Sequence, residues 1–260
     1  MTTDERPLEP DQPVEEDRPD PAAEERPKKR HLPIWQESIL LVVFALVLAV
    51  VIKAVFVQAF YIPSESMEPG LAENDRILVQ KVSYWFGGSP QRGDVVVFKD
   101  PDNWLGGEDA GPTNPVTRLM AEIGLYPEGG HLVKRVVGVA GDTITCCDDE
   151  GRIAVNGQAI DEDGYLAQNP GTACNGPMTG NCDWEAGPVP EGHLFVMGDN
   201  RDHSADSTVH LCQKNQTDCT LNPYVDADLV VGKVFMLVWP SDRFGRIGTP
   251  DAFDDVPDPE

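Results

Sequence analysis

The chain has 260 residues, which is enough for one large or two small domains. Its 44 acidic residues outnumber 20 basic residues and give a formal net charge of −24. This balance argues against a nucleic-acid-binding protein, because such a protein needs a basic surface to displace counterions from phosphates. Six cysteines without a Cys-X-X-Cys pair argue against a zinc ribbon or a thioredoxin-type redox site.

Residues 1–33 form the first predicted region, an acidic tail that is rich in proline. A segment of this composition buries too little apolar surface to offset the entropy lost on ordering, so we expect it to be disordered. Its end carries a basic cluster formed by Arg26, Lys28, Lys29 and Arg30.

Residues 34–57 form the second region, which contains a single charge, Lys53, between Ser38 and Val57. A helix of about 20 residues is about 30 Å long, close to the thickness of the hydrocarbon core of a bilayer. A buried core helix seldom runs this long without polar residues. The apolar part of a cleaved signal peptide is usually shorter and is followed by a small-residue cleavage site. The sequence therefore predicts one retained transmembrane anchor.

The charges on either side of the anchor predict its orientation. The basic cluster precedes the anchor, whereas the next basic residue beyond it is Arg76, after several acidic residues. The positive-inside rule therefore predicts a single-pass protein of the plasma membrane. Its tail would be cytoplasmic, and residues 58–248 would form an extracytoplasmic domain.

All six cysteines follow the anchor, where the predicted orientation allows disulfides to persist. We expect the pairs Cys174–Cys182 and Cys212–Cys219, while Cys146 and Cys147 have no assigned partner. A metal site that uses histidines near Cys212 is a minor alternative, because the spacings do not match a zinc pattern.

Short runs of β-branched residues recur through the domain, and Gly, Pro, Asn and Asp separate them. This pattern predicts a mainly β body, either a barrel or a sandwich. The runs are RILVQKV (76–82), GDVVVFK (93–99), HLVKRVVGV (131–139), HLFVMG (193–198) and VVGKVFMLVW (230–239). The last residues, 249–260, are acidic and predict a second disordered end.

The segment PSESMEP, from Pro63 to Pro69, directly follows the anchor. Two prolines stiffen the backbone on either side of Ser64 and Ser66. A rigid turn could present the Ser66 hydroxyl as a nucleophile and direct the Ser64 hydroxyl and the Ser66 amide toward one point, as an oxyanion hole requires. The residues alone favour a simpler interpretation, a proline-rich stalk.

Lys134 lies in the run 131–139, on the same strand face as Leu132 and Val136. Apolar neighbours remove hydration from an ammonium group and lower its pKa, and a base that acts near neutrality needs a fall from about 10.4 to roughly 7–8. The commoner alternative is a strand lysine whose amine reaches water. A polar run from Met197 to Ser207 predicts either a tight turn or a support for a catalytic group.

Four segments together, PSESMEP, RGDVVVF, KRVVGVAGD and GDNRDHSADS, follow the anchor in this order and resemble the sequence boxes of bacterial type I signal peptidases. The resemblance implies a signal-peptidase-like β-barrel or sandwich and a serine endopeptidase that requires no metal or organic cofactor. It also implies that the substrates are secretory preproteins, cleaved at the bilayer surface after an Ala-X-Ala site. A non-enzymatic, membrane-anchored binding domain on a proline-rich stalk remains the alternative.

The resemblance implies that Ser66 is the nucleophile and Lys134 the general base. Ser64 would help the Ser66 amide to form the oxyanion hole, and Ser204 would hydrogen-bond the lysine and orient it.

Two further residues match supporting positions of the family. Asp206 would be a structural acidic residue close to the site, and Met67 would pack beneath the turn. Thr208 stands where many members have an arginine. An Asp–Arg pair would therefore need Arg201 or Arg243 as a substitute.

Overall fold

The computed structural model describes residues 33–101, 104–105, 114, 130–168, 174, 178, 182–212 and 222–259. The chain divides into two compact units, Met1–Ala45 and Leu46–Glu260. The predicted tail up to residue 32 lies outside the described residues.

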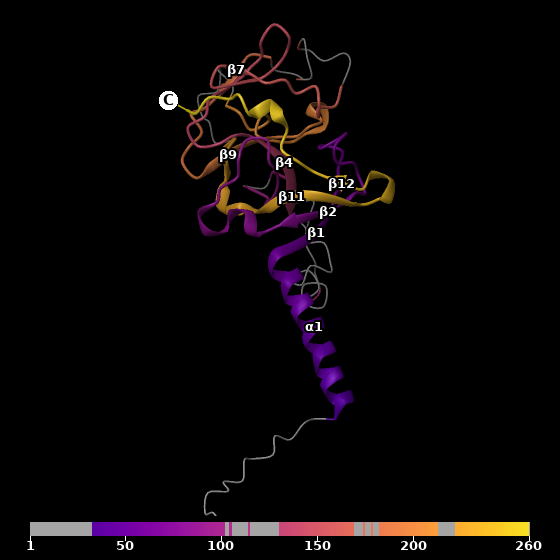
Figure 1. Cartoon of the computed structure of the whole chain (residues 1–260). Coiled ribbons are helices and arrows are strands. Elements are labelled where there is room, and N and C mark those ends of the chain that lie inside the picture. The colour runs from indigo at the N-terminus through magenta and orange to yellow at the C-terminus, as the bar shows by residue number, and fades with distance from the viewer. Residues whose placement is uncertain are drawn as a thin grey trace, which may run out of the picture. The chain divides into compact units, whose positions relative to one another are not determined.

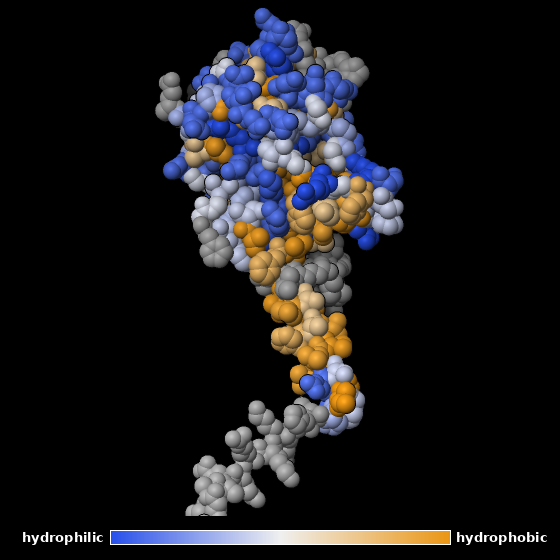
Figure 2. Space-filling view, viewed as in Figure 1, coloured by the Kyte–Doolittle hydropathy of each residue, from blue (hydrophilic) through white to orange (hydrophobic). Residues whose placement is uncertain are grey.

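Helix α1 (Ile34–Phe56) occupies the apolar region that the sequence predicts to be an anchor. No glycine or proline interrupts it, and leucine, alanine and valine side chains fill most of it. None of the residues from Ile34 to Val51 is buried, and apolar side chains dominate the surface of the helix, with polar ones near its start (Figure 2). By length and composition α1 can cross a membrane.

The larger sheet has eight strands, all antiparallel, in the order β1-β2-β11-β3-β4-β9-β10, with β12 paired to β11 (Figure 1). The mainly β prediction is confirmed, since each of the five predicted runs contains a strand. The bounds are β1 (Val57–Tyr61), β2 (Arg76–Gln80), β3 (Val95–Lys99), β4 (His131–Gly138), β9 (His193–Met197), β10 (Val225–Asp226), β11 (Val230–Trp239) and β12 (Gly245–Arg246).

A smaller antiparallel sheet of four strands has the order β7-β6-β5-β8. Its strands are β5 (Ile144–Cys146), β6 (Ala154–Val155), β7 (Gln158–Ala159) and β8 (Trp184–Ala186). Short 3-10 helices complete the described elements: η1 (Val82–Gly87), η2 (Arg201–His203), η3 (Ala227–Leu229), η4 (Ser241–Arg243) and η5 (Asp251–Phe253).

Strand β3 shows that both faces of the larger sheet are covered. Val95 and Val97 pack into one apolar cluster, whereas Val96 and Phe98 pack into another. Since successive side chains of a strand point to opposite faces, the run VVVF is buried on both sides. Any polar side chain on the neighbouring strand β4 therefore enters a largely dry environment.

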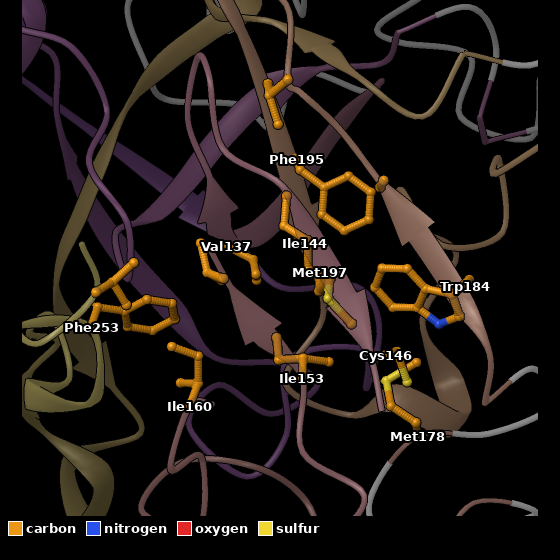
Figure 3. Close-up of a cluster of buried hydrophobic side chains, with 14 of the residues drawn as sticks. Val137, Ile144, Cys146, Ile153, Ile160, Met178, Trp184, Phe195, Met197 and Phe253 are labelled. Carbon is orange, nitrogen blue, oxygen red and sulfur yellow. The ribbon is translucent and has the colours of Figure 1, made fainter. Parts of the chain in front are cut away.

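A third apolar cluster joins the two sheets (Figure 3). Val137, Phe195 and Met197 come from the larger sheet, and Ile144 and Trp184 come from the smaller one. The smaller sheet is therefore packed on the larger one and forms part of the same body.

The C-terminal segment differs from its prediction. Phe253 and Val256 are buried in the third cluster, and the carbonyl of Pro257 accepts a hydrogen bond from Asn156. The expectation of a disordered end over residues 249–260 is therefore wrong for the described part of this segment. Its average composition is acidic, but two apolar side chains are enough to fix it to the body.

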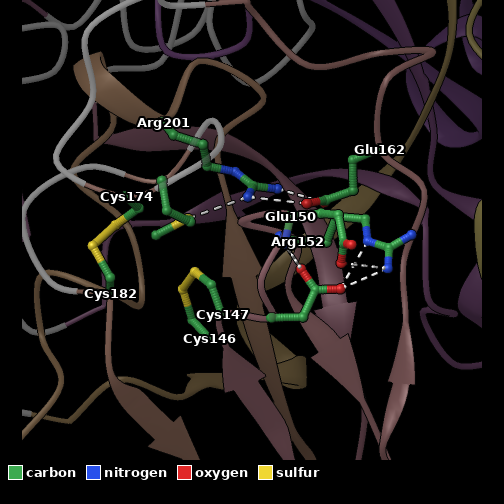
Figure 4. The surroundings of a disulfide bond; sticks show 10 residues. Cys146, Cys147, Glu150, Arg152, Glu162, Cys174, Cys182 and Arg201 are labelled. Atoms are coloured by element: carbon green, nitrogen blue, oxygen red, sulfur yellow. Dashed lines mark hydrogen bonds and ion pairs between the residues drawn. A yellow bond between two sulfur atoms is a disulfide. The ribbon is translucent and has the colours of Figure 1, made fainter.

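The disulfide Cys174–Cys182 is present, as predicted, with a Cα–Cα distance of 5.5 Å (Figure 4). Cys146 and Cys147, left without partners by the sequence analysis, are bonded to each other. The predicted pair Cys212–Cys219 includes Cys219, which lies outside the described residues.

Replacing Phe253 by alanine should lower the free energy of unfolding by about 3 to 5 kcal/mol, because it removes a buried aromatic ring and leaves a cavity. Phe244→Ala is the matched control, since Phe244 is 63% exposed and Phe253 only 6%. Denaturant unfolding of the detergent-solubilised protein measures both. Equal effects of the two variants would contradict the packing of the C-terminal segment.

Candidate active site

The segment PSESMEP lies in the loop between β1 and β2. Hydrogen bonds between Ile62 and both Asn74 and Asp75 close this loop at its base. Within it, Met67 accepts a hydrogen bond from the amide of Leu71, which makes a tight turn next to Ser66. The loop is thus folded onto the body and is not an extended stalk.

Ser66 is buried at the tip of this turn, with 5% of its surface exposed. Asn200 holds the main chain on either side of it. The amide nitrogen of Asn200 donates to the Ser66 carbonyl at 3.0 Å, and its side-chain Nδ2 donates to the Glu65 carbonyl at 3.2 Å. Sequence reasoning missed Asn200, although it lies within the polar run after β9.

Lys134 lies on β4, where it pairs in register with Val96 of β3. Its Nζ donates a hydrogen bond to Ser66 Oγ at 2.6 Å, and the side chain is buried. Loss of hydration lowers the pKa of Lys134 to about 8, although the charges of Asp206 and Asp199 act in the opposite direction. The amine can therefore lose its proton close to neutral pH.

Ser64 Oγ lies 3.3 Å from Ser66 Oγ. Ser64 is exposed, whereas Ser66 is buried. A hydroxyl at this distance can donate a hydrogen bond to an oxygen bound near the nucleophile.

Asp206 is buried and accepts four hydrogen bonds from neutral donors. Oδ2 accepts from the amide of Gly198 at 2.9 Å and from the hydroxyl of Ser204. Oδ1 accepts from the amide and the hydroxyl of Thr208, at 3.0 and 2.7 Å. Asp206 therefore fixes the fold of the polar loop that follows β9.

The geometry of Ser204 differs from the expectation that its hydroxyl bonds the lysine. The hydroxyl donates to Asp206, whereas the Lys134 amine bonds Ser66. Ser204 is nevertheless close to the loop 63–69, which contains Ser66. A Cβ placed on Gly198 would lie 2.3 Å from Ser204 Oγ and 2.5 Å from the Ser66 carbonyl oxygen. Only glycine fits at position 198, a requirement that the sequence alone does not reveal.

Neither arginine that the sequence analysis considered forms an ion pair with Asp206 within the described residues. Arg243 pairs with Asp75 at 2.9 Å and donates to the Pro69 carbonyl. Arg201 pairs with Glu162. Thr208 instead donates its amide and hydroxyl hydrogens to Oδ1 of Asp206.

Met67 is buried in the same apolar cluster as Leu71, Ile62 and Val95. Arg135, the neighbour of Lys134 on β4, makes a two-pronged ion pair with Asp199 at 2.8 and 2.6 Å. Within the part of the chain that the structure describes, no group of three His, Cys, Asp or Glu side chains could hold a metal ion.

The site can perform nucleophilic chemistry. A hydroxyl that contacts a buried amine with a lowered pKa can be deprotonated as it attacks a carbonyl. A second hydroxyl and a main-chain amide lie beside it.

Comparison with known proteins identifies the family. The family model described as "Signal peptidase, peptidase S26" matches residues 35–239. A Signal peptidase I from Mycobacterium tuberculosis is 41% identical over 238 residues, which cover 86% of this chain and 78% of the relative. A Signal peptidase I from Leptolyngbya laminosa is 32% identical and covers 84% of this chain and 86% of its own.

Among solved structures, a signal peptidase I from Enterococcus faecalis V583 aligns with 55% of this chain and 95% of its own, at 22% identity and a TM-score of 0.29. The order and pairing of the strands define the fold of this chain. The match of the family model over most of the chain and the identity to curated relatives agree, and this chain belongs to the signal peptidase family S26, the serine endopeptidases named signal peptidase I.

Proposed function

We propose that this chain cleaves signal peptides from secreted preproteins through a Ser66–Lys134 dyad. The observation that carries the proposal is the 2.6 Å contact between Lys134 Nζ and Ser66 Oγ, with both side chains buried. The alternative, a non-enzymatic domain on a stalk, requires an exposed serine and a solvated lysine, and the buried contact argues against it.

The reaction begins with an extended cleavage segment of the preprotein bound beside the nucleophile loop as an added strand. Neutral Lys134 accepts the proton of Ser66 while Ser66 Oγ attacks the scissile carbonyl carbon. The Ser66 amide and the Ser64 hydroxyl donate to the oxyanion. Protonated Lys134 then gives its proton to the leaving amine, and water hydrolyses the ester in the second half of the reaction.

Three residues would support the dyad without reacting. Asp206 fixes the loop after β9, Ser204 of that loop donates to Asp206, and Met67 is buried in the apolar cluster next to Ser66. The resemblance implies small side chains, typically alanine, at the first and third positions before the cut.

The anchor is part of this proposal. Strand β1 starts directly after α1, so Ser66 follows the membrane-spanning segment closely along the chain. A preprotein whose signal peptide lies in the same bilayer would meet the site at a raised local concentration. The basic cluster before α1 favours a cytoplasmic N-terminus and an extracytoplasmic catalytic body in the plasma membrane.

Replacing Ser66 by alanine or Lys134 by methionine should lower the rate of preprotein cleavage by about 1,000-fold or more, because each change removes one member of a unit that acts together. The measurement is gel-based cleavage of a preprotein with an Ala-X-Ala site by the purified protein in detergent. Ser241→Ala and Lys99→Met are matched controls on exposed residues. Cleavage at the parent rate by either dyad variant would refute the assignment.

The value of kcat/KM should rise with pH along a curve with an apparent pKa near 8, because only the neutral amine of Lys134 can accept the serine proton. A normal lysine would titrate at about 10.4. Initial rates between pH 6 and 10, at a temperature where the protein stays folded, give the curve. A profile that is flat across this range would contradict the role of Lys134.

Gly198→Ala should lower kcat by about 10-fold or more, because the added Cβ would meet the Ser66 carbonyl and the Ser204 hydroxyl and displace the nucleophile. Gly248→Ala is the control, since a Cβ there meets no atom within 4 Å. Circular dichroism confirms that both variants are folded. Equal kcat values for the two variants would show that the close approach at residue 198 does not position Ser66.

A further inference from the structure

The segment 160–168, which follows β7 in the smaller sheet, touches both halves of the candidate site. Leu166 forms a single β-bridge with Pro69 at the end of the nucleophile loop. The next residue, Ala167, donates its amide hydrogen to the carbonyl of Asp199 at 3.0 Å, in the loop after β9. This segment therefore lies where the two catalytic loops meet, namely residues 63–69 with Ser66 and residues 198–207 after β9.

Glu162 gives the segment a buried charge. Its carboxylate makes a two-pronged ion pair with Arg201, at 2.6 and 3.3 Å, and the two side chains are only 3% and 2% exposed (Figure 4). Tyr165 donates its hydroxyl hydrogen to the same carboxylate at 2.6 Å. A charge this deep keeps a fixed position, because moving it away from its partner would leave both charges unpaired in a dry environment.

Arg201 links Glu162 to the loop that holds the main chain of Ser66. Its Nε donates to the carbonyl of Gly198 at 2.9 Å, so the guanidinium closes the turn that starts at Gly198. Within that turn, Asn200 donates to the Ser66 carbonyl, and Gly198 lies against the same oxygen. A displacement of Arg201 would therefore move the atoms that fix the Ser66 main chain.

We propose that Glu162 is a positioning residue for the reaction: through Arg201 and the Gly198 carbonyl it holds the Ser66 main chain at the distance that the dyad needs. The side chain of Glu162 bonds Arg201 and Tyr165 and neither member of the dyad, and Glu162 lies outside the sequence boxes that suggested the function. The kinetic part of the inference rests on the proposed peptidase activity, whereas the effect on the position of the loop does not.

The test compares Glu162→Gln with Arg92→Gln. Glutamine at residue 162 keeps the size of the side chain and removes its charge. Arg92→Gln breaks a different ion pair, with Asp142 at 2.6 Å. The further hydrogen bonds of these two side chains involve Val139, Asn156 and Val256, which lie outside residues 63–69 and 198–207. Both variants should lose thermal stability, so the control separates lost stability from lost positioning.

The kinetic measurement is kcat and KM for preprotein cleavage, at a temperature well below the melting points of all variants. Glu162→Gln should lower kcat by about 10- to 100-fold with a change in KM of less than about 3-fold, because a small displacement of a reacting atom affects the chemical step more than binding. Arg92→Gln should keep kcat within about 2-fold. Equal kcat values for the two variants would overturn the proposal.

Amide hydrogen exchange provides the arm that does not depend on activity. Glu162→Gln should speed exchange in peptides that cover residues 64–70 and 198–204, relative to Arg92→Gln. Unchanged protection there would overturn the inference even if the protein cleaves preproteins. Failure of the parent to cleave would refute the proposed function alone, and exchange would still decide the role of Glu162.

Tyr165→Phe is the second variant in case Glu162→Gln does not fold. It removes only the hydroxyl that donates to Glu162, so the ion pair remains. It should lower kcat in the same direction by a smaller factor, and an exchange pattern identical to that of the parent would count against the proposal.

Discussion

The candidate site depends on one constraint. The amine of Lys134 must be buried away from water, with no carboxylate in direct contact. Burial lowers the pKa of Lys134, and a carboxylate bonded to it would raise the pKa again. The carboxylates that raise the pKa of Lys134 are Asp206 and Asp199, whose charges favour the protonated amine. The rest of the fold keeps both carboxylates occupied by other donors while the Lys134 amine contacts Ser66.

The dry environment comes from the position of β4 in the sheet. Strand β4 lies between β3 and β9, and apolar clusters cover both faces of the larger sheet. Lys134 and Arg135 are neighbours on this strand and point to opposite faces, so each meets a different environment. Arg135 forms an ion pair with Asp199, which stabilises its charge, whereas Lys134 contacts the hydroxyl of Ser66.

Much of the fold follows from local sequence, but the site follows from it only in part. The β-branched runs predict the strands, because β-branched side chains pack well on a buried or half-buried strand and are visible in the local sequence. The dryness of Lys134 depends on Val96 and on a loop that starts at Pro63, far away in the chain. The residues alone therefore favour the stalk and the solvated lysine, and only the resemblance of four ordered segments links Ser66 with Lys134.

The features that the sequence does not reveal share a physical cause. Gly198 is required because two other segments approach it closely, and no turn pattern indicates this. Phe253 and Val256 are isolated in an acidic segment, so average composition hides them. Asn200 and Glu162 act through partners far along the chain, and a single sequence contains no record of such contacts.

The distribution of buried charges determines how far the pKa of Lys134 falls. Arg135 pairs with Asp199 and Arg201 pairs with Glu162, so each buried arginine has its own carboxylate. Asp206 belongs to neither pair, and its oxygens are satisfied by neutral amide and hydroxyl donors.

Thr208 also affects the balance of charge around Lys134. A hydroxyl and an amide at this position stabilise Asp206 without adding a positive charge beside it, so the carboxylate retains its attraction for the protonated amine. An arginine there would weaken that attraction and lower the pKa of Lys134 further. The pKa of about 8 thus reflects a balance between burial, which lowers it, and the charges of Asp206 and Asp199, which raise it.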